Sequence, residues 1–285
     1  MDQVSTLERI LRGIAISLVI IFFMFPILWI FLMSFQTNET ILQVPPKLFF
    51  EPTIVNYQGL ITGQLETAAG SLKIEFMGNL FNSLFLSTAA VIVGLLLGVP
   101  AAYAFARLKF KGSEDIAFTL LSFRFAPPLL VLLPLTIYFQ KIGLADTYVG
   151  LIWVYQLIVL PLILWIVRGY FEDIPADIEY AYRIAGHGFW ATFRRIALPL
   201  AGPGIAAAGL LAFIFSWNNF IFALVLASAD KQPVTVGALA FITASGINYG
   251  QIAAGIVLSI APTFALAMYA QRYLVEGLSL GAVKG

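Results

Sequence analysis

Residues 14–33 read IAISLVIIFFMFPILWIFLM, a run of twenty residues without a single charge. Crossing about 30 Å of hydrocarbon takes roughly 20 mostly apolar residues in a helix, because lipid offers no partner to unpaired backbone groups. The run is longer than the roughly 7–15 apolar residues of a signal peptide, and no small-residue cleavage site follows it. We therefore interpret it as a retained membrane helix.

Five further segments meet the same length requirement, so the sequence predicts an all-α membrane protein of six transmembrane helices. We expect a single domain over 1–285, with a polar external lobe at 36–78 and a cytoplasmic loop at 171–203. The prolines inside the spans predict kinks. The six predicted spans are 14–33, 80–105, 116–139, 148–167, 204–227 and 252–269.

The composition excludes several classes of protein. Of the 285 residues 60% are hydrophobic and 11% are charged, against roughly a quarter charged in a soluble domain. The net charge of +1 provides no basic excess for nucleic acid. The chain has no cysteine and one histidine, His187, which excludes a disulfide framework and leaves no cluster for a metal.

The basic residues indicate the orientation of the spans, because cytoplasmic loops carry an excess of Lys and Arg. Six spans place both termini on one side, and eleven basic residues fall on that side against four on the other. We therefore expect a multi-pass membrane protein with both termini in the cytoplasm. The eleven are Arg9, Arg12, Arg107, Lys109, Lys111, Arg168, Arg183, Arg194, Arg195, Arg272 and Lys284, and the four are Lys47, Lys73, Lys141 and Lys231.

The cytoplasmic loop reads FEDIPADIEYAYRIAGHGFWATFRRIALPLAGP over 171–203. Pro175 suits the first turn of a helix, and Gly186 and Gly188 can end or bend it, so we expect two short helices, the second over about 189–197. The loop is rich in aromatic residues, which dominate protein–protein contacts. From the residues alone, a protein-docking knuckle and a helix pair lying on the lipid headgroups are equally favoured.

The same loop resembles the EAA signature of ABC importer permeases. The signature has nine residues between a glycine and an I-x-L-P element. This spacing is matched by Gly186 and Ile196-Ala197-Leu198-Pro199. Upstream the match is imperfect, because Tyr180 stands at the glutamate position and Glu179 lies one residue earlier. Other stretches resemble the carbohydrate-uptake branch, and in particular its smaller six-span subunit of the maltose and polyol type: FFEPTIVNYQGL, AAYAFARLKFKG, FAPPLLVLLPLTIYFQKIGLADT, SWNNFIFAL and QRYLVEGLSLGAVKG.

This resemblance implies a type I permease fold and a set of partners: a second permease subunit, a cytoplasmic ATPase dimer and an external solute-binding protein. The chain contains no phosphate-binding P-loop, so ATP and Mg²⁺ would be bound by the partner ATPase and this chain would have no cofactor and no catalytic residue. The external loop 228–251 is the expected contact with the binding protein. The residues implied in ATPase coupling are Glu179, Tyr180, Ala181, Tyr182, Arg183, Gly186, His187, Phe189, Trp190, Ile196, Leu198 and Pro199.

Arg124 is the one charge inside a predicted span, where a charge costs about 2.5–3.5 kcal/mol on insertion scales. No Asp or Glu lies inside any of the six spans, so Arg124 has no intramembrane acid partner in this chain. Either it faces a translocation cavity, or it contacts carbonyls freed near Pro127-Pro128. We favour the cavity.

Two other polar groups lie in hydrophobic surroundings, Tyr155-Gln156 and Trp217-Asn218-Asn219. Carbohydrate sites combine amide hydrogen bonds with aromatic faces, so we include both groups in the predicted pathway. The alternative for each is interhelical hydrogen bonding. For Asn82 that alternative is favoured, and GLLLG at 94–98 predicts close helix packing.

Two other functions compete with an ATP-driven permease. A proton- or sodium-coupled carrier usually has an intramembrane carboxylate or an inverted repeat, and the sequence shows neither. A membrane scaffold without ATPase coupling would not need the signature loop. We therefore expect a permease subunit for a sugar, polyol or glycoside.

Overall fold

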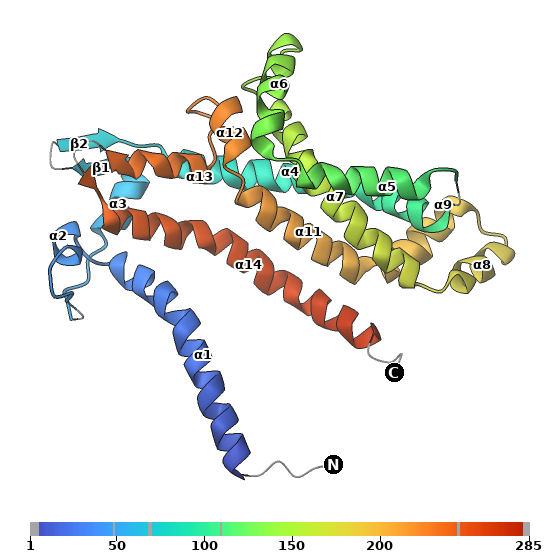
Figure 1. Ribbon diagram of the computed structural model, residues 1–285, viewed down its shortest axis with the longest axis horizontal. Helices are drawn as coiled ribbons and strands as arrows, with labels where there is room; N and C mark the ends of the chain where they lie inside the picture. Colours follow the sequence, from blue (N-terminus) through green and yellow to red (C-terminus); the bar gives the residue numbers. More distant parts are fainter. Residues whose placement is uncertain (1–5, 48, 68–69, 109, 244–245, 282–285) are drawn as a thin grey trace. The chain divides into compact units, whose positions relative to one another are not determined.

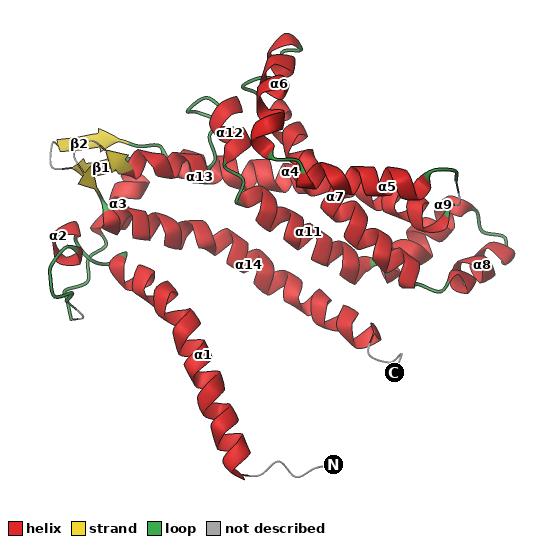
Figure 2. Ribbon diagram, viewed as in Figure 1, coloured by secondary structure: helices red, strands yellow, loops and turns green. Residues whose placement is uncertain are grey.

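The computed structural model describes residues 6–47, 49–67, 70–108, 110–243 and 246–281. Lys109 and Lys284, which contribute to the predicted orientation, lie outside these residues. The described chain forms two compact units, one of residues 1–77 and 238–260 and one of 78–237 and 261–285. Helices dominate both units (Figure 2). The expectation of one domain over the whole chain remains a prediction.

The first unit holds the N-terminal helix and the predicted external lobe. Helix α1 (Thr6–Met33) buries none of its apolar side chains against the residues that the structure describes. The lobe is folded, as predicted, and Asn56 anchors it by donating to the carbonyls of Ser34 and Gln36, at 2.9 and 2.8 Å. Its elements are α2 (Asn38–Ile41), α3 (Val55–Thr62), the hairpin β1 (Gln64–Thr67) and β2 (Gly70–Lys73), η3 (Ala238–Phe241), and the hairpin β3 (Ile242–Thr243) and β4 (Gly246–Ile247).

Long helices make up most of the second unit (Figure 1). Its long helices are α4 (Phe76–Arg107), α7 (Tyr148–Asp173) and α14 (Tyr249–Gly281), of which the first residues of α4 and α14 belong to the first unit. Small residues allow α4 and α7 to approach: a Cβ on Gly94 or Gly98 would meet the side chain of Ile163 at 3.0 or 2.8 Å. This confirms the close packing predicted for GLLLG.

The predicted span 116–139 is broken rather than continuous. Helix α5 (Ser113–Ser122) and the 3₁₀ turn η1 (Phe123–Phe125) lead to α6 (Pro128–Lys141), which is bent by 98° from them. Ala126 and Pro127, each followed by a proline, are extended between the two helices, in keeping with the preference of a residue before proline for extended backbone. Prolines 100, 134, 161 and 262, by contrast, lie within helices without ending them.

The predicted span 204–227 is broken as well. Helix α11 (Gly202–Trp217) stops before α12 (Ile221–Leu226), and residues 218–220 separate them. Helices α6 and α12, which follow the two breaks, pack against each other and stand out together from the layer of α5, α7 and α11 in Figure 1. The described residues hold four candidate spans, or up to six if two bent helix pairs each count as one span: 113–125 with α6, and 189–200 with α11, which are bent by 98° and 70°.

Candidate functional site

The predicted cytoplasmic loop folds into a knuckle of two short helices, which we define as residues 175–197. Helix α8 (Ala176–Ile184) begins after Pro175, and α9 (Phe189–Thr192) continues through a π-helical turn, η2 (Phe193–Ala197), into α10 (Leu198–Leu200). Gly186 connects the helices with a φ of 91°, a conformation that glycine adopts without a steric penalty. The two-helix knuckle expected from the sequence is therefore present.

Glu179 joins the knuckle to α4. Its Oε1 accepts from Nε of Arg107 at 2.7 Å, and its Oε2 accepts from the hydroxyl of Tyr103 at 2.5 Å. Arg107 also donates to the carbonyl of Ile174 at 2.8 Å, which ties the entry of α8 to the same point. Glu179 is only 2% exposed, so its carboxylate faces the chain's own helix rather than a partner.

Aromatic rings fill the space around this ion pair. The ring of Tyr103 lies 5.2 Å from that of Phe171, 5.6 Å from that of Phe189 and 4.8 Å from that of Phe193, measured between centroids. Phe171 and Phe193 are buried. Hydrophobic contacts and a buried ion pair therefore hold the knuckle to the C-terminal ends of α4 and α7 in one arrangement.

The outer face of the knuckle is exposed and largely apolar. Tyr180, at the position of the family's glutamate, is 57% exposed, and Ile184 at the end of α8 is 87% exposed. The ring of His187 stacks on Tyr182 with centroids 4.0 Å apart. Exposed apolar side chains on a charged loop are typical of a protein contact. The other predicted coupling residues on this loop are exposed or half-buried: Ala181, Arg183, Gly186, Phe189, Trp190, Ile196, Leu198 and Pro199.

Arg124 lies at the break between α5 and α6. Its guanidinium covers the ring of Phe215 on α11, 4.3 Å from the centroid. Within the described residues it has no hydrogen-bond acceptor and no acid partner, so the expected alternative, a bond to carbonyls freed near Pro127-Pro128, is not formed. Arg124 therefore presents unused donors beside an aromatic face.

Asn218 follows Phe215 by three residues and caps the C-terminus of α11, at the break between α11 and α12. It is exposed, and its Nδ2 donates to the carbonyl of Ile214 at 2.8 Å. We call Arg124, Phe215 and Asn218 the break cluster. Phe215 was not among the predicted pathway residues, because one more phenylalanine in an apolar span gives no signal by itself.

The remaining predicted pathway residues are buried away from this cluster's exposed face. Trp217 is buried and stacks on Phe213, with centroids 5.5 Å apart. Gln156 is buried and donates to the carbonyl of Ala90 on α4 at 3.0 Å, which is the interhelical alternative. Tyr155 and Asn219 are also buried. The structure thus separates these residues into the exposed break cluster and buried positions between helices.

A cavity of about 960 Å³ lies elsewhere in the same unit, among α4, α11 and the later part of α14. Its lining is almost wholly apolar and includes Leu84, Leu95, Leu210, Phe213 and Leu266. Such a lining offers few partners to sugar hydroxyls, so the cavity is not a carbohydrate site by its chemistry. No group of three or more His, Asp and Glu side chains in the described residues is placed to hold a metal ion.

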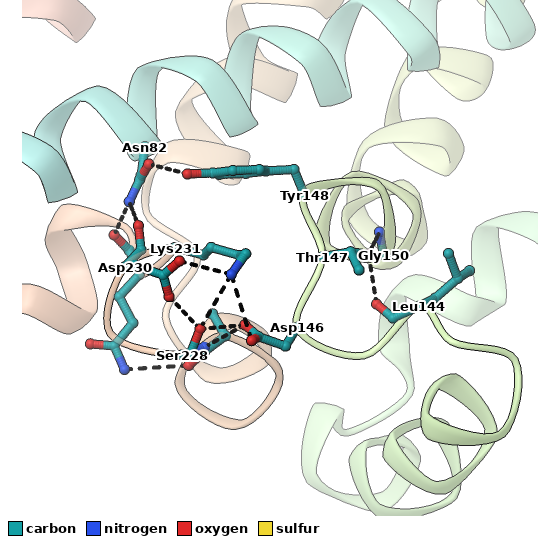
Figure 3. Close-up of polar contacts among 11 residues, drawn as sticks. Asn82, Leu144, Asp146, Thr147, Tyr148, Gly150, Ser228, Asp230 and Lys231 are labelled. Carbon is teal, nitrogen blue, oxygen red and sulfur yellow. Dashed lines mark hydrogen bonds and ion pairs between the residues drawn. The ribbon is translucent and has the colours of Figure 1, made fainter.

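At the end of α4 and α7 opposite the knuckle, a polar network joins the α6–α7 turn to the segment after α12 (Figure 3). Asp146, in the left-handed conformation with φ 54°, accepts from the backbone nitrogen of Ser228 at 2.8 Å and from its hydroxyl at 2.5 Å. Lys231 lies 2.8 Å from Asp230 and 3.6 Å from Asp146. The hydrogen bonds of Ser228 hold the pKa of the Asp146 carboxyl below its ordinary value, and the bond to Asp230 raises the pKa of Lys231.

Asn82 of α4 extends this network. Its Nδ2 donates to the carbonyls of Asp230 and Gln232 at 2.9 and 3.1 Å, and its Oδ1 accepts from Tyr148 at 2.8 Å. The structural role expected for Asn82 is confirmed. We call the residues of both paragraphs the external staple, after the side of the membrane on which the sequence predicts them: Asn82, Asp146, Tyr148, Ser228, Asp230 and Lys231.

A comparison with known protein families shows to which family the chain belongs. Residues 91–279 match the model of the binding-protein-dependent transport system inner membrane component. The chain belongs to this family. The family resemblance noted from the EAA-like loop is confirmed, and the alternatives of a secondary carrier or an uncoupled scaffold are set aside because the relatives are ABC permeases.

Relatives align along nearly the whole chain. The trehalose transport system permease protein SugB of Mycobacterium tuberculosis is 34% identical over 94% of this chain and 95% of its own length. The trehalose/maltose transport system permease protein MalG of Thermococcus litoralis is 32% identical over 99% of both chains. A solved chain of a bacterial ABC transporter that imports the acidic polysaccharide alginate has a TM-score of 0.76 at 22% identity, over 96% of this chain and 99% of that chain, which shows the type I permease fold.

Proposed function

We propose that this chain forms half of the translocation pathway of an ATP-driven importer for a sugar, polyol or glycoside, with both termini in the cytoplasm. The observation that carries the proposal is the knuckle: an exposed apolar face fixed to α4 by the Glu179–Arg107 pair. The relatives named for trehalose and maltose support the substrate class. ATP and Mg²⁺ would be bound by the partner ATPase.

The knuckle would couple the ATPase to the membrane helices as a rigid unit. Tyr180 and Ile184 on its outer face would contact the ATPase, whereas Glu179 on the inner face would carry its displacement to Arg107 at the end of α4. Because the ion pair and the aromatic rings fix one arrangement, a movement of α8 would be passed on rather than absorbed within the loop.

The break cluster would contact the substrate on its way through the membrane. Irregular backbone at membrane depth is tolerated only where it is buried in protein or lines an aqueous cavity. Both breaks are irregular, and an unpaired arginine there faces water or a polar ligand more favourably than lipid. Arg124 and Asn218 would donate hydrogen bonds to hydroxyl or carboxylate oxygens, and Phe215 would supply an aromatic face.

A second permease subunit would complete the pathway. In this chain the break cluster is open on one side, since Asn218 is exposed and Arg124 is half-buried. A charged, open surface in the bilayer needs a protein cover. The external solute-binding protein would dock on the loop 228–251, of which the external staple fixes the first residues to α4 and the α6–α7 turn. Positions 244–245 of this loop lie outside the described residues.

Reconstituted transport tests this proposal. The chain would be co-expressed with the genes of its transporter, purified through a tag on the permease and inserted into proteoliposomes with ATP inside. We expect an ATPase and a second permease to co-purify, and ATP-dependent accumulation of a labelled disaccharide or polyol when the binding protein is added. Purification of the chain without an ATPase would contradict the proposal.

A further inference from the structure

A basic pocket lies on the knuckle, and two of the predicted coupling residues, His187 and Trp190, belong to its lining. It is a cavity of about 430 Å³ lined by His187, Trp190, Ala191, Arg194 and Arg195. The residues come from the glycine turn, from α9 and from the π-helical turn η2. Such π-helical turns are frequent at functional sites, because they shift side chains out of the regular helical positions.

The positive charge of this pocket is not neutralised within the chain. Arg194 and Arg195 are exposed, and neither forms an ion pair or side-chain hydrogen bond with any residue that the structure describes. None of the lining residues is acidic. The pocket therefore offers two guanidinium groups, whose planar forks match the oxygens of a phosphate.

An exposed tryptophan forms another wall. Trp190 is 64% exposed, and its ring packs against the ring of Phe193, with the two centroids 6.1 Å apart. Arg195 precedes the start of the membrane helix α11 at Gly202 by seven residues, about two helical turns. Tryptophan and arginine are the residues that gather at the boundary between hydrocarbon and headgroups. The pocket thus combines phosphate chemistry with the composition of a membrane interface.

We propose that this pocket binds the phosphate of an anionic lipid headgroup, such as that of phosphatidylglycerol, with Arg194 and Arg195 as phosphate ligands and Trp190 against the glycerol backbone. The inference rests on the proposed function only in placing this loop at the cytoplasmic membrane surface. The bound lipid would lie beside α8 and α9, where the lipid composition of the membrane could adjust the docking of the ATPase.

Lipid retention by the complete transporter tests the proposal without ATP. The complex would be purified from nanodiscs that contain phosphatidylglycerol and phosphatidylcholine in equal amounts, and the lipids retained after detergent exchange would be counted by native mass spectrometry. We expect selective retention of phosphatidylglycerol. In the double variant Arg194→Gln/Arg195→Gln that selectivity should fall at least about tenfold, because each basic residue at an anionic surface contributes about 1 kcal/mol.

The double variant Arg9→Gln/Arg12→Gln is the matched control, since it removes the same charge from α1 and leaves the pocket intact. It should keep the selectivity of the unchanged transporter. Equal loss in both variants would show a general charge effect and overturn the site. Displacement of the lipid by millimolar inorganic phosphate would assign the pocket to free phosphate instead. Unchanged lipid retention in Arg194→Gln/Arg195→Gln, with loss of the co-purifying ATPase, would assign it to the protein partner.

These outcomes are distinguishable from failure of the proposed function. Lipid retention is measured in the absence of nucleotide and substrate, so a transporter without uptake would still report on the pocket. Conversely, a transporter with full uptake but no selective lipid retention would leave the proposed function intact and overturn this inference.

Discussion

The Nε of Arg107 and the Oε1 of Glu179 lie 2.7 Å apart, and this ion pair joins the C-terminal end of α4 to the knuckle. Arg107 is 12% exposed and Glu179 is 2% exposed, so the pair is almost fully removed from water. Breaking a buried pair by removing one partner typically costs about 3–5 kcal/mol, because the other charge is left without compensation. The position of the knuckle therefore depends on this contact.

Replacing Glu179 by Gln should loosen the knuckle without removing its outer face. We expect a lower apparent melting temperature and several-fold less uptake for each ATP hydrolysed, with the ATPase still co-purifying. The matched control is Glu172→Gln, because Glu172 is about half exposed in its ion pair with Arg168 and surface pairs contribute about 0–1 kcal/mol. Unchanged coupling in Glu179→Gln would show that the pair has no part in transmission.

The turn between α8 and α9 offers a second test, because its two glycines differ in conformation. Gly186 has a φ of 91°, which costs an L-residue roughly 1–2 kcal/mol, whereas Gly188 has a φ of −76° that any residue adopts. Gly186→Ala should lower ATP hydrolysis stimulated by the binding protein, and Gly186→Arg should abolish it. Gly188→Ala should have little effect, since a Cβ there meets nothing within 4 Å. Equal activities of Gly186→Ala and Gly188→Ala would refute the role of this turn.

Arg124 should be required for substrate passage. Arg124→Ala removes its free donors and the cation over Phe215, so we expect a rise in the substrate concentration for half-maximal uptake and a lower maximal rate. Phe215→Leu should raise only that concentration, because it keeps the arginine and removes the aromatic face. Full uptake and affinity in purified transporter carrying Arg124→Ala would exclude the cavity role.

The external staple should be insensitive to pH near neutrality. The pKa of Asp146 is lowered by its hydrogen bonds from Ser228, so its contribution is present above the ordinary carboxyl value of about 3.9 and is lost as pH falls through the lowered pKa. The pKa of Lys231 is raised, so its contribution is present below the ordinary value of about 10.4 and is lost as pH rises through the raised pKa. Amide exchange of residues 226–231 should therefore show equal protection from pH 5 to 9, after correction for the intrinsic rate.

Two substitutions separate the carboxylate of Asp146 from its backbone conformation. Asp146→Gly keeps the left-handed backbone and removes the hydrogen bonds to Ser228, whereas Asp146→Ala removes the bonds and adds strain at φ 54°. We expect faster amide exchange at residues 226–231 in both variants, and the faster exchange of the two in Asp146→Ala.

For the unchanged protein, amide protection of residues 226–231 that changes strongly between pH 5 and 7 would contradict the assignment of the staple.

The helices and the knuckle could be predicted from local sequence, because span length and glycine position are local properties. The two breaks were harder to predict: Pro127-Pro128 suggested a kink, whereas Trp217-Asn218-Asn219 showed only polarity inside an apolar segment. The direction of Glu179 could not be predicted, since its partners Tyr103 and Arg107 lie more than 70 residues earlier in the chain. The association of Arg124 with Phe215 likewise depends on how α5 and α11 pack.

The central claim is that the exposed face of the knuckle contacts an ATPase, and cross-linking from a single cysteine tests it most directly. The chain has no cysteine, so Ile184→Cys provides one reactive thiol on the knuckle, and Leu130→Cys on α6 provides the control, at 74% exposure against 87% for Ile184. With a short thiol-specific photo-crosslinker in inverted membrane vesicles, we expect an adduct with the ATPase from position 184 and none from position 130. An ATPase adduct of equal yield from both positions, or from neither, would contradict the account.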